Sequence, residues 1–336
     1  MIKEISIIVF FLFNTLLFNT TMAVEILRTP DERFENLQDF PFKPNYMQIG
    51  DFRVHYLDEG PSDGLPILLI HGEPTWSYLF RKMIPVFTAA GHRVIAPDLI
   101  GFGRSDKLAN RKDYSYRLQV DVMLELVQKL NLNGVTFFGQ DWGGLIGLRV
   151  IATEPERFER IVVSNTGLPS AAGLKGWIGY PIFKFMVWRQ GAISFEEFQS
   201  KVTFPRWVAY TYHVDELPID TLMNNATTDE SIGAAYEAPF PSKRYKVGPQ
   251  IMPYLVPSQL RENERAWKVF ESWDKPFLVA FTDHDPITRG GEKIFLKRVP
   301  VAQNIAIKGA GHFVQEDAGE ELATIINEFI VGKEFK

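Results

Sequence analysis

The 336-residue chain contains no cysteine, which excludes disulfides, thiolate metal sites and cysteine nucleophiles. It has no long basic run, and 36 lysines and arginines against 41 acidic residues give a net charge of −5. Both features argue against nucleic acid as the main partner. The remaining composition, 46% hydrophobic and 23% charged, is that of an ordinary globular protein. The length suffices for one large α/β domain or for a core with an inserted smaller one.

Residues 1–23 differ from the rest of the chain, because they hold an apolar run over residues 5–17 and small residues before position 24. The pattern predicts a signal peptide cleaved after Ala23, and hence a periplasmic or secreted protein. The alternative, which we favour, is a translation start at Met22 and a cytoplasmic protein. The run is interrupted by Asn14 and is too short to span a bilayer comfortably. We therefore expect no membrane partner for the mature domain.

Apolar, β-branched runs alternate with amphipathic helical stretches along most of the chain, which predicts a mostly parallel sheet with helices on both faces, an α/β fold. The expected strands are Arg53–Leu57, Pro66–Ile70, Arg93–Ala96, Val135–Phe138, Ile161–Ser164, Pro276–Phe281 and Asn304–Ile307. The expected helices are Leu118–Leu130, Gly143–Ala152 and Glu320–Ile330. Near-continuous apolar strands are typical of burial on both faces.

The alternation stops between about Leu168 and Val256, where aromatic residues, prolines and short helical fragments occur without a strong strand. This predicts a helical cap over residues 168–256, inserted between core segments 24–167 and 257–336. A cap at that point would lie over the carboxyl ends of the strands, where open α/β sheets bind ligands.

A sharp turn between a strand and a helix is predicted at Gly-Gln-Asp-Trp-Gly-Gly, residues 139–144. The pattern matches a nucleophile elbow with Asp141 in the place of the nucleophile. Gly143 and Gly144 would let the helix pack close to the strand. The alternative is that Asp141 only caps the helix, since aspartate is a favoured N-cap residue.

A hydrolase of this plan orders its nucleophile, acid and histidine along the chain in that sequence. His312 follows the last predicted strand in a glycine-rich loop, so we expect it to be the catalytic histidine. The acid should follow the strand before it, where Asp285 is our choice and Asp283 the alternative. The loop after the preceding strand offers Asn165 and no carboxylate, which favours the later position.

A carboxylate in the elbow indicates displacement of a leaving group at saturated carbon, which gives an alkyl ester of Asp141. Aspartate is ionised at neutral pH and needs no base for that step. His312, oriented by Asp285, would then activate a water that hydrolyses the ester. We expect the backbone amides of Glu73 and Trp142 to hold the oxyanion.

Three motifs together resemble the haloalkane dehalogenases: His71-Gly72-Glu73-Pro74-Thr75-Trp76, the elbow at residues 139–144, and Ala235-Tyr236-Glu237-Ala238-Pro239-Phe240-Pro241. The resemblance covers the chain from about Glu25 onward. It implies an α/β-hydrolase fold with a cap, a halogenated aliphatic substrate, a primary alcohol and a halide ion as products, and no metal or organic cofactor. We expect a monomer.

The resemblance also implies two halide-binding tryptophans, because an indole N–H is a weak donor on an otherwise apolar ring. Trp142 is one. On the cap, Trp188 followed by Arg189 fits the family pattern, and Trp207 is the other tryptophan available. Candidates for the pocket walls, any of which could instead be plain core, are Phe183, Phe185, Phe204, Trp207 and Phe313.

Two other functions remain open from the sequence. An epoxide hydrolase would use the same aspartate but needs two cap tyrosines directed at it, and the chain offers Tyr210, Tyr212, Tyr236 and Tyr245. A binding protein on this fold would have no need for the intact set of Asp141, Asp285 and His312.

Overall fold

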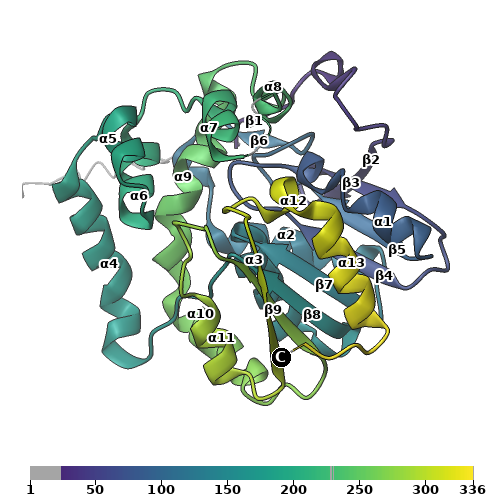
Figure 1. Cartoon of the computed structure of the whole chain (residues 1–336). Coiled ribbons are helices and arrows are strands. Elements are labelled where there is room, and N and C mark those ends of the chain that lie inside the picture. The colour runs from purple at the N-terminus through teal and green to yellow at the C-terminus, as the bar shows by residue number, and fades with distance from the viewer. Residues whose placement is uncertain (1–23, 228, 230, 336) are drawn as a thin grey trace, which may run out of the picture.

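The computed structural model describes residues 24–227, 229 and 231–335, so the predicted signal peptide lies outside the described residues. An eight-stranded sheet with the order β10-β9-β8-β7-β4-β5-β3-β2 forms the centre of the molecule (Figure 1). Its strands are β2 (Asn45–Ile49), β3 (Phe52–Glu59), β4 (Pro66–Ile70), β5 (Arg93–Pro97), β7 (Val135–Gln140), β8 (Phe158–Ser164), β9 (Phe277–Thr282) and β10 (Ala302–Ile307). The six strands from β10 to β5 are parallel, and β3 and β2 extend one edge antiparallel. The predicted α/β fold is confirmed, although β2 was not predicted.

Helices cover both faces of this sheet. The helices of the core are α1 (Ile84–Ala89), α2 (Tyr116–Lys129), α3 (Trp142–Thr153), α10 (Leu260–Phe270), α11 (Glu292–Arg298), α12 (Val314–Asp317) and α13 (Gly319–Ile330). Successive side chains of the central strands enter opposite apolar clusters: Phe137 packs on the side of α2 and α3, and Phe138 on the side of α1 and α13. Burial on both faces explains why these strands read as continuous apolar runs.

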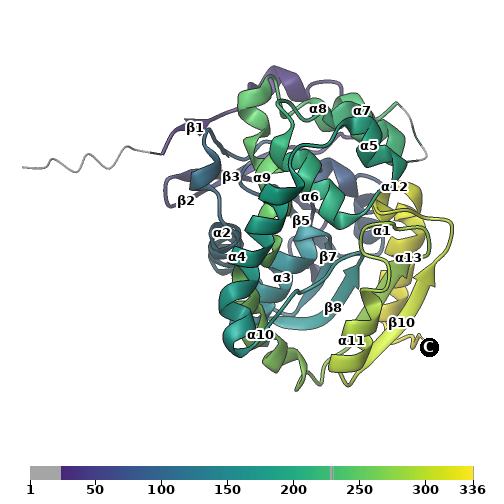
Figure 2. The same ribbon diagram turned by 90° about the vertical axis from the view of Figure 1, so that its left-hand side faces the viewer.

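Between Ser164 and Phe277 the described chain contains helices and no strand. The helices are α4 (Gly173–Gln190), α5 (Phe195–Ser200), α6 (Phe204–His213), α7 (Ile219–Ala226), α8 (Gly233–Glu237) and α9 (Val247–Leu255), followed by α10. Figures 1 and 2 show α4 to α8 gathered beside one end of the sheet, whereas α10 packs against α3. In the described part of the chain, no helix is both long enough and apolar enough to cross a bilayer.

Candidate active site

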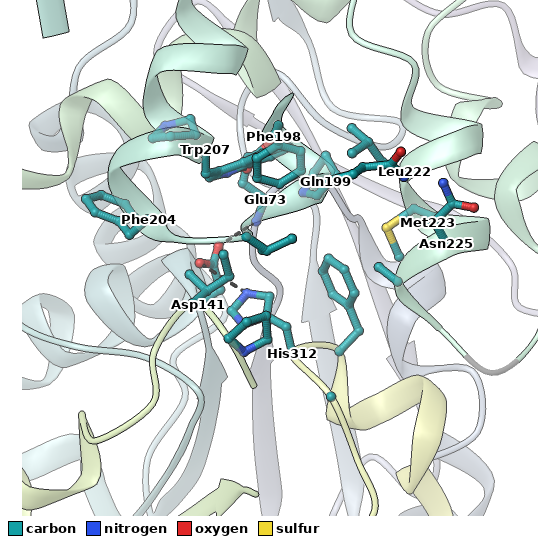
Figure 3. A pocket seen from close by; sticks show the side chains of 18 of the residues that line it. Glu73, Asp141, Phe198, Gln199, Phe204, Trp207, Leu222, Met223, Asn225 and His312 are labelled. Atoms are coloured by element: carbon teal, nitrogen blue, oxygen red, sulfur yellow. Dashed lines mark hydrogen bonds and ion pairs between the residues drawn. The ribbon is translucent and has the colours of Figure 1, made fainter. Parts of the chain in front are cut away.

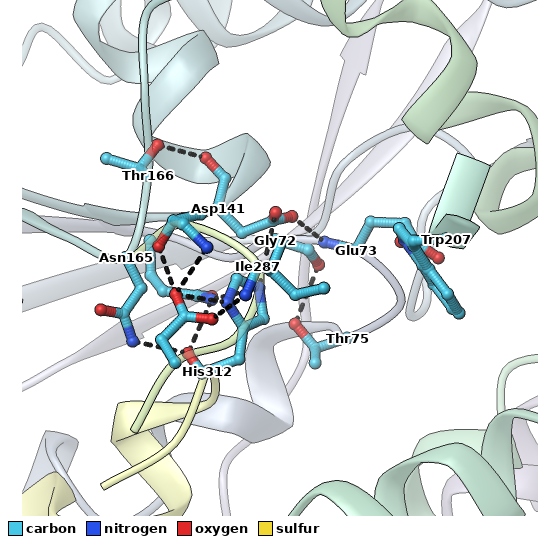
Figure 4. Close-up of polar contacts among 12 residues, drawn as sticks. Gly72, Glu73, Thr75, Asp141, Asn165, Thr166, Trp207, Ile287 and His312 are labelled. Atoms are coloured by element: carbon cyan, nitrogen blue, oxygen red, sulfur yellow. Dashed lines mark hydrogen bonds and ion pairs between the residues drawn. The ribbon is translucent and has the colours of Figure 1, made fainter. Parts of the chain in front are cut away.

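Asp141 lies at the sharp turn between β7 and α3, with φ 51° and ψ −126°. Positive φ is unfavourable for a residue with a side chain, and such strain is concentrated at functional sites. Its side chain makes no capping hydrogen bond to α3, so the helix-cap interpretation is wrong. Instead, Oδ1 accepts a 2.8 Å hydrogen bond from the backbone N–H of Glu73 (Figure 4). The strained turn therefore presents the carboxylate to the loop after β4.

Close packing at this turn leaves no room for side chains at two glycines. A Cβ on Gly72 would lie 2.4 Å from the Asp141 Cβ, and a Cβ on Gly143 would lie 1.8 Å from the carbonyl oxygen of Ile70. The close approach expected of Gly143 is therefore present. These two glycines let the loop after β4 and the first turn of α3 meet around the carboxylate.

The structure brings His312 and Asp285 to the same place as Asp141. His312 Nδ1 lies 3.0 Å from Asp285 Oδ2, and Nε2 lies 3.6 Å from Asp141 Oδ2. Asp285 is buried and accepts a 2.7 Å hydrogen bond from the N–H of Ile287. Burial raises its pKa, but the charge and hydrogen bond of His312 outweigh burial and lower the pKa to about 2. Asp283 instead accepts from the N–H of Gly309 and is partly exposed, so the geometry favours Asp285.

The pKa of His312 depends on both carboxylates. Burial lowers it, but the negative charge of Asp285 and the contacts with Asp141 raise it more, to about 10. With both carboxylates ionised, the imidazole is therefore protonated at neutral pH. A neutral group in place of the Asp141 carboxylate would remove one of the two charges that hold the proton.

Asn165 and Gln140, whose roles were not predicted, hold the histidine loop. The Asn165 amide donates to the carbonyl oxygens of Gly311 and His312, each at 3.0 Å, and accepts from the N–H of Thr282 at 3.0 Å (Figure 4). The Gln140 amide also donates to the carbonyl of His312 at 3.0 Å. Each is a polar residue at the carboxyl end of a buried strand, a position that often carries function in open α/β sheets.

A cavity of about 400 Å³ opens over Asp141 (Figure 3). Its wall is mostly apolar and includes side chains of the core and of α5, α6, α7 and α9. The lining residues are Glu73, Pro74, Asp141, Trp142, Phe195, Phe198, Gln199, Val202, Phe204, Trp207, Leu222, Met223, Asn225, Ala226, Pro253, Val256, His284, Pro286, Ile287, Gly311, His312 and Phe313. Among the described residues no lysine or arginine lines it, so the cavity suits a small uncharged ligand.

The structure corrects the expected cap tryptophan. Trp188 is 72% exposed on α4 and does not line the cavity, whereas Trp207 on α6 does. Consecutive residues of a helix point about 100° apart, and on α4 it is Val187 that faces inward. The basic residue after Trp188 therefore gave a misleading match. Phe204 stands three residues before Trp207, on the same face of α6, and both line the cavity. The same spacing occurs at Phe185 and Trp188, so the sequence held no signal that separates the two tryptophans.

Of the other expected wall residues, Phe204 and Phe313 line the cavity. Phe183 and Phe185 do not; both lie on α4, and Phe185 is exposed there. Trp142, the expected partner of the cap tryptophan, lines the cavity next to Asp141 and packs edge-on against Tyr116. Its backbone N–H belongs to the first turn of α3, where no helix carbonyl receives it.

Trp207 and Glu73 are joined by a hydrogen bond from the indole Nε1 to Glu73 Oε2 at 3.1 Å (Figure 4). The other carboxyl oxygen of Glu73 is buried and has no hydrogen-bond partner in the part of the chain that is described. Burial, together with the charge of Asp141, raises the Glu73 pKa well above its usual range. The environment thus favours the neutral acid at Glu73.

Three of the four cap tyrosines considered for an epoxide hydrolase make contacts elsewhere. Tyr210 stacks on Phe198, and Tyr212 stacks on Tyr254. The Tyr236 hydroxyl bonds to Glu316. In the described part of the chain, no tyrosine lines the cavity. The described residues therefore do not supply the pair of tyrosines that the epoxide-hydrolase alternative needs.

Comparison with known proteins agrees with this geometry. Residues 66–319 match the family described as alpha/beta hydrolase fold. The chain is 44% identical to a haloalkane dehalogenase of Psychrobacter cryohalolentis, over 91% of this chain and 98% of that protein. It is 42% identical to one from Mycolicibacterium paratuberculosis, over 89% and 96%. A tetrameric haloalkane dehalogenase structure from Paraglaciecola agarilytica NO2 superimposes with a TM-score of 0.76 at 34% identity, over 90% of this chain and 97% of that one. The chain is therefore a member of the haloalkane dehalogenase family, built on the α/β-hydrolase fold.

Proposed function

We propose that this protein hydrolyses haloalkanes to a primary alcohol, a halide ion and a proton through a covalent ester of Asp141. The observation that carries the proposal is a strained aspartate in an apolar cavity with an imidazole 3.6 Å from its carboxylate. Family membership supports the same reaction. The cavity in which it takes place lies beneath the cap proposed for residues 168–256.

In the first step an oxygen of Asp141 attacks the carbon that bears the halogen, so that a C–O bond forms while the carbon–halogen bond breaks. Oδ1 is held by the N–H of Glu73, which assigns it to the future oxyanion and leaves Oδ2 as the attacking atom. The departing halide takes the bonding electron pair. The indole N–H groups of Trp142 and Trp207 are the donors proposed to receive it.

Glu73 has two roles in this proposal. Its backbone N–H, with that of Trp142, stabilises the oxyanion. Its side chain, as a neutral acid, accepts the single indole N–H of Trp207 before the halide forms and adds no second negative charge beside Asp141, so that the halide can then accept this N–H in its place. An ionised Glu73 would repel the departing halide and hold the indole N–H more strongly.

Water hydrolyses the ester in the second step. Formation of the ester removes the charge of Asp141, so the pKa of His312 falls and its proton passes to solvent as the proton product of the reaction. The neutral imidazole can now accept a proton. It then takes the proton of a water that attacks the ester carbonyl, and Asp285 stabilises the resulting imidazolium. Collapse of the tetrahedral intermediate releases the alcohol and restores Asp141. Ester formation in the first step therefore makes His312 able to act as the base of the second step.

The test is halide release from terminal bromo- and chloroalkanes, with styrene oxide hydrolysis assayed beside it. Bromide release that is lost in Asp141→Ala is expected, together with little epoxide opening. The His312→Gln variant should accumulate the alkyl-enzyme, seen as one added alkyl mass on the intact protein. An unmodified His312→Gln protein after long incubation with substrate would exclude the covalent route, and epoxide opening without halide release would contradict the assignment.

The quaternary state is a separate proposal. The tetrameric relative, at 34% identity, supports self-association of this chain in place of the monomer expected from the sequence.

A further inference from the structure

Helix α4 carries an unusual concentration of exposed apolar side chains. Among the described residues, seven of the fourteen exposed large hydrophobic side chains lie on this one helix. They are Leu174, Trp177, Ile178, Ile182, Phe185, Met186 and Trp188, and we call them the outer stripe. Figure 2 shows α4 at the surface, turned toward the viewer. Scattered exposed apolar residues need no explanation, but a contiguous patch of this kind marks an interaction site.

The outer stripe is distinct from the face that fixes α4 to its own subunit. Val187 is buried, and Tyr180 is partly buried with its ring against Tyr254 of α9, while α4 as a whole contacts α6 and α10. A helix that is apolar on opposite sides is normally enclosed on both. On α4 the inner side is covered by the subunit itself, and the outer side is exposed. Trp177 and Trp188, near the two ends of the stripe, are 64% and 72% exposed.

The order of residues along the stripe suits a second copy of the same helix. A twofold axis requires each residue to meet the one at the mirrored position of its partner. If the axis passes between Pro181 and Ile182, an antiparallel pair of helices sets Ile178 against Phe185 and places the two copies of Ile182 beside each other. Both contacts are apolar.

The size of the stripe fits the same partner. A standard interface buries about 800 Å² on each side. Phe and Trp side chains each bury roughly 150–250 Å², and three of the seven stripe residues are of these types, all more than half exposed. The stripe can therefore supply the apolar centre of an interface of ordinary size.

The response to salt distinguishes a second copy from an anionic lipid surface, the other occupant that an apolar helix can have. The charged residues of α4 are Lys175, Lys184 and Arg189, with no acid. Binding of these cations to lipid phosphates would weaken as salt is added. A helix pair centred on the stripe would contain no ion pair, so salt should not weaken it.

We propose that the outer stripe of α4 is the contact between two copies of this chain, which pair antiparallel about an axis between Pro181 and Ile182. The inference rests on the self-association proposed above and is independent of the dehalogenase chemistry.

Sedimentation equilibrium of the full chain tests the surface. Phe185→Glu should halve the oligomer, from dimer to monomer or from tetramer to dimer. Leu296→Glu, a matched change at an exposed position of α11, should leave it unchanged. The wild-type oligomer should also persist in 1 M NaCl. Halide release should be normal in both variants, which shows that they are folded.

Each other outcome has a distinct meaning. A monomeric wild type overturns both this inference and the proposed self-association. An oligomer that Phe185→Glu leaves intact overturns the α4 contact alone. A monomer that binds phosphatidylglycerol vesicles, and loses that binding in Phe185→Glu, assigns the stripe to lipid instead.

The register has its own test, because the chain has no natural cysteine. Ile182→Cys lies beside the proposed axis and should form a disulfide-linked dimer under mild oxidation. Leu174→Cys should not, since at 1.5 Å per residue its two copies lie roughly 22 Å apart along the pair, beyond the reach of a disulfide. Equal cross-linking of both variants would refute the antiparallel register.

Discussion

The charge of Asp141 should control the protonation of His312. The two side chains lie 3.6 Å apart and are both largely buried. At an effective dielectric constant of 20, unit charges at this distance interact by about 4.6 kcal/mol. That energy corresponds to more than a thousandfold change in a protonation constant. Asp141→Asn keeps the shape of the side chain and removes the charge, as ester formation would, so the pKa of His312 should fall from about 10 toward its ordinary range.

Nuclear magnetic resonance of the histidine ring protons between pH 5 and 11 measures this change directly. The chain has six histidines, and the signal of His312 is the one absent from the His312→Gln spectrum. Asp285→Asn serves as the comparison, because it removes the other charge that holds the proton. If the pKa of His312 stays near 10 in Asp141→Asn, the charge of Asp141 does not control the protonation of His312. The proposal that ester formation makes His312 a base would then be wrong.

Three further predictions address the site. Trp207→Phe should weaken bromide binding about tenfold to a hundredfold, because it removes one hydrogen bond to an ion, whereas Trp188→Phe should not change bromide binding. Quenching of tryptophan fluorescence by bromide measures both affinities. Equal effects of the two substitutions would contradict the assignment of Trp207 as the halide donor. Gly72→Ala should lower kcat/KM at least about a hundredfold with Tm little changed, because the added Cβ would displace the Asp141 carboxylate. Full activity of this variant would show that the loop after β4 can move to make room for the methyl group. The low pKa of Asp285 means that it stabilises the fold above its ordinary titration range and loses this contribution as pH falls through about 2. Urea unfolding between pH 5 and 2 should therefore show a steeper loss in the wild type than in Asp285→Asn, by on the order of 2 kcal/mol, and identical slopes would exclude the carboxylate as the cause.

The sheet and the positions of Asp141, Asp285 and His312 could be predicted because they follow from local pattern and chain order. Continuous apolar runs mark strands buried on both faces, and the fold then fixes which loops meet at the carboxyl ends of those strands. Strand β2 (Asn45–Ile49) escaped prediction because it lies at the edge of the sheet and has polar residues at Asn45 and Gln48.

The cap could not be oriented in the same way. Trp188 and Trp207 both lie on aromatic helices, and only their neighbours decide which face of each helix meets the cavity. On α4 the usual rule fails altogether, because apolar residues occupy both the inner and the outer face. A sequence pattern reports that a helix has an apolar face, but not whether that face meets its own subunit or another molecule.

The Asn165 bridge has a consequence for how this molecule can change. Asn165 directly follows β8 and bonds to Thr282 at the end of β9, so it joins the carboxyl ends of two neighbouring parallel strands. The same amide holds the histidine loop. The ends of β8 and β9 and the histidine loop are therefore held by bonds within the core and not by the helices between Ser164 and Phe277. Exchange of those helices should therefore change substrate preference, and with it the halide donor proposed at Trp207, while Asp141, Asp285 and His312 stay with the core.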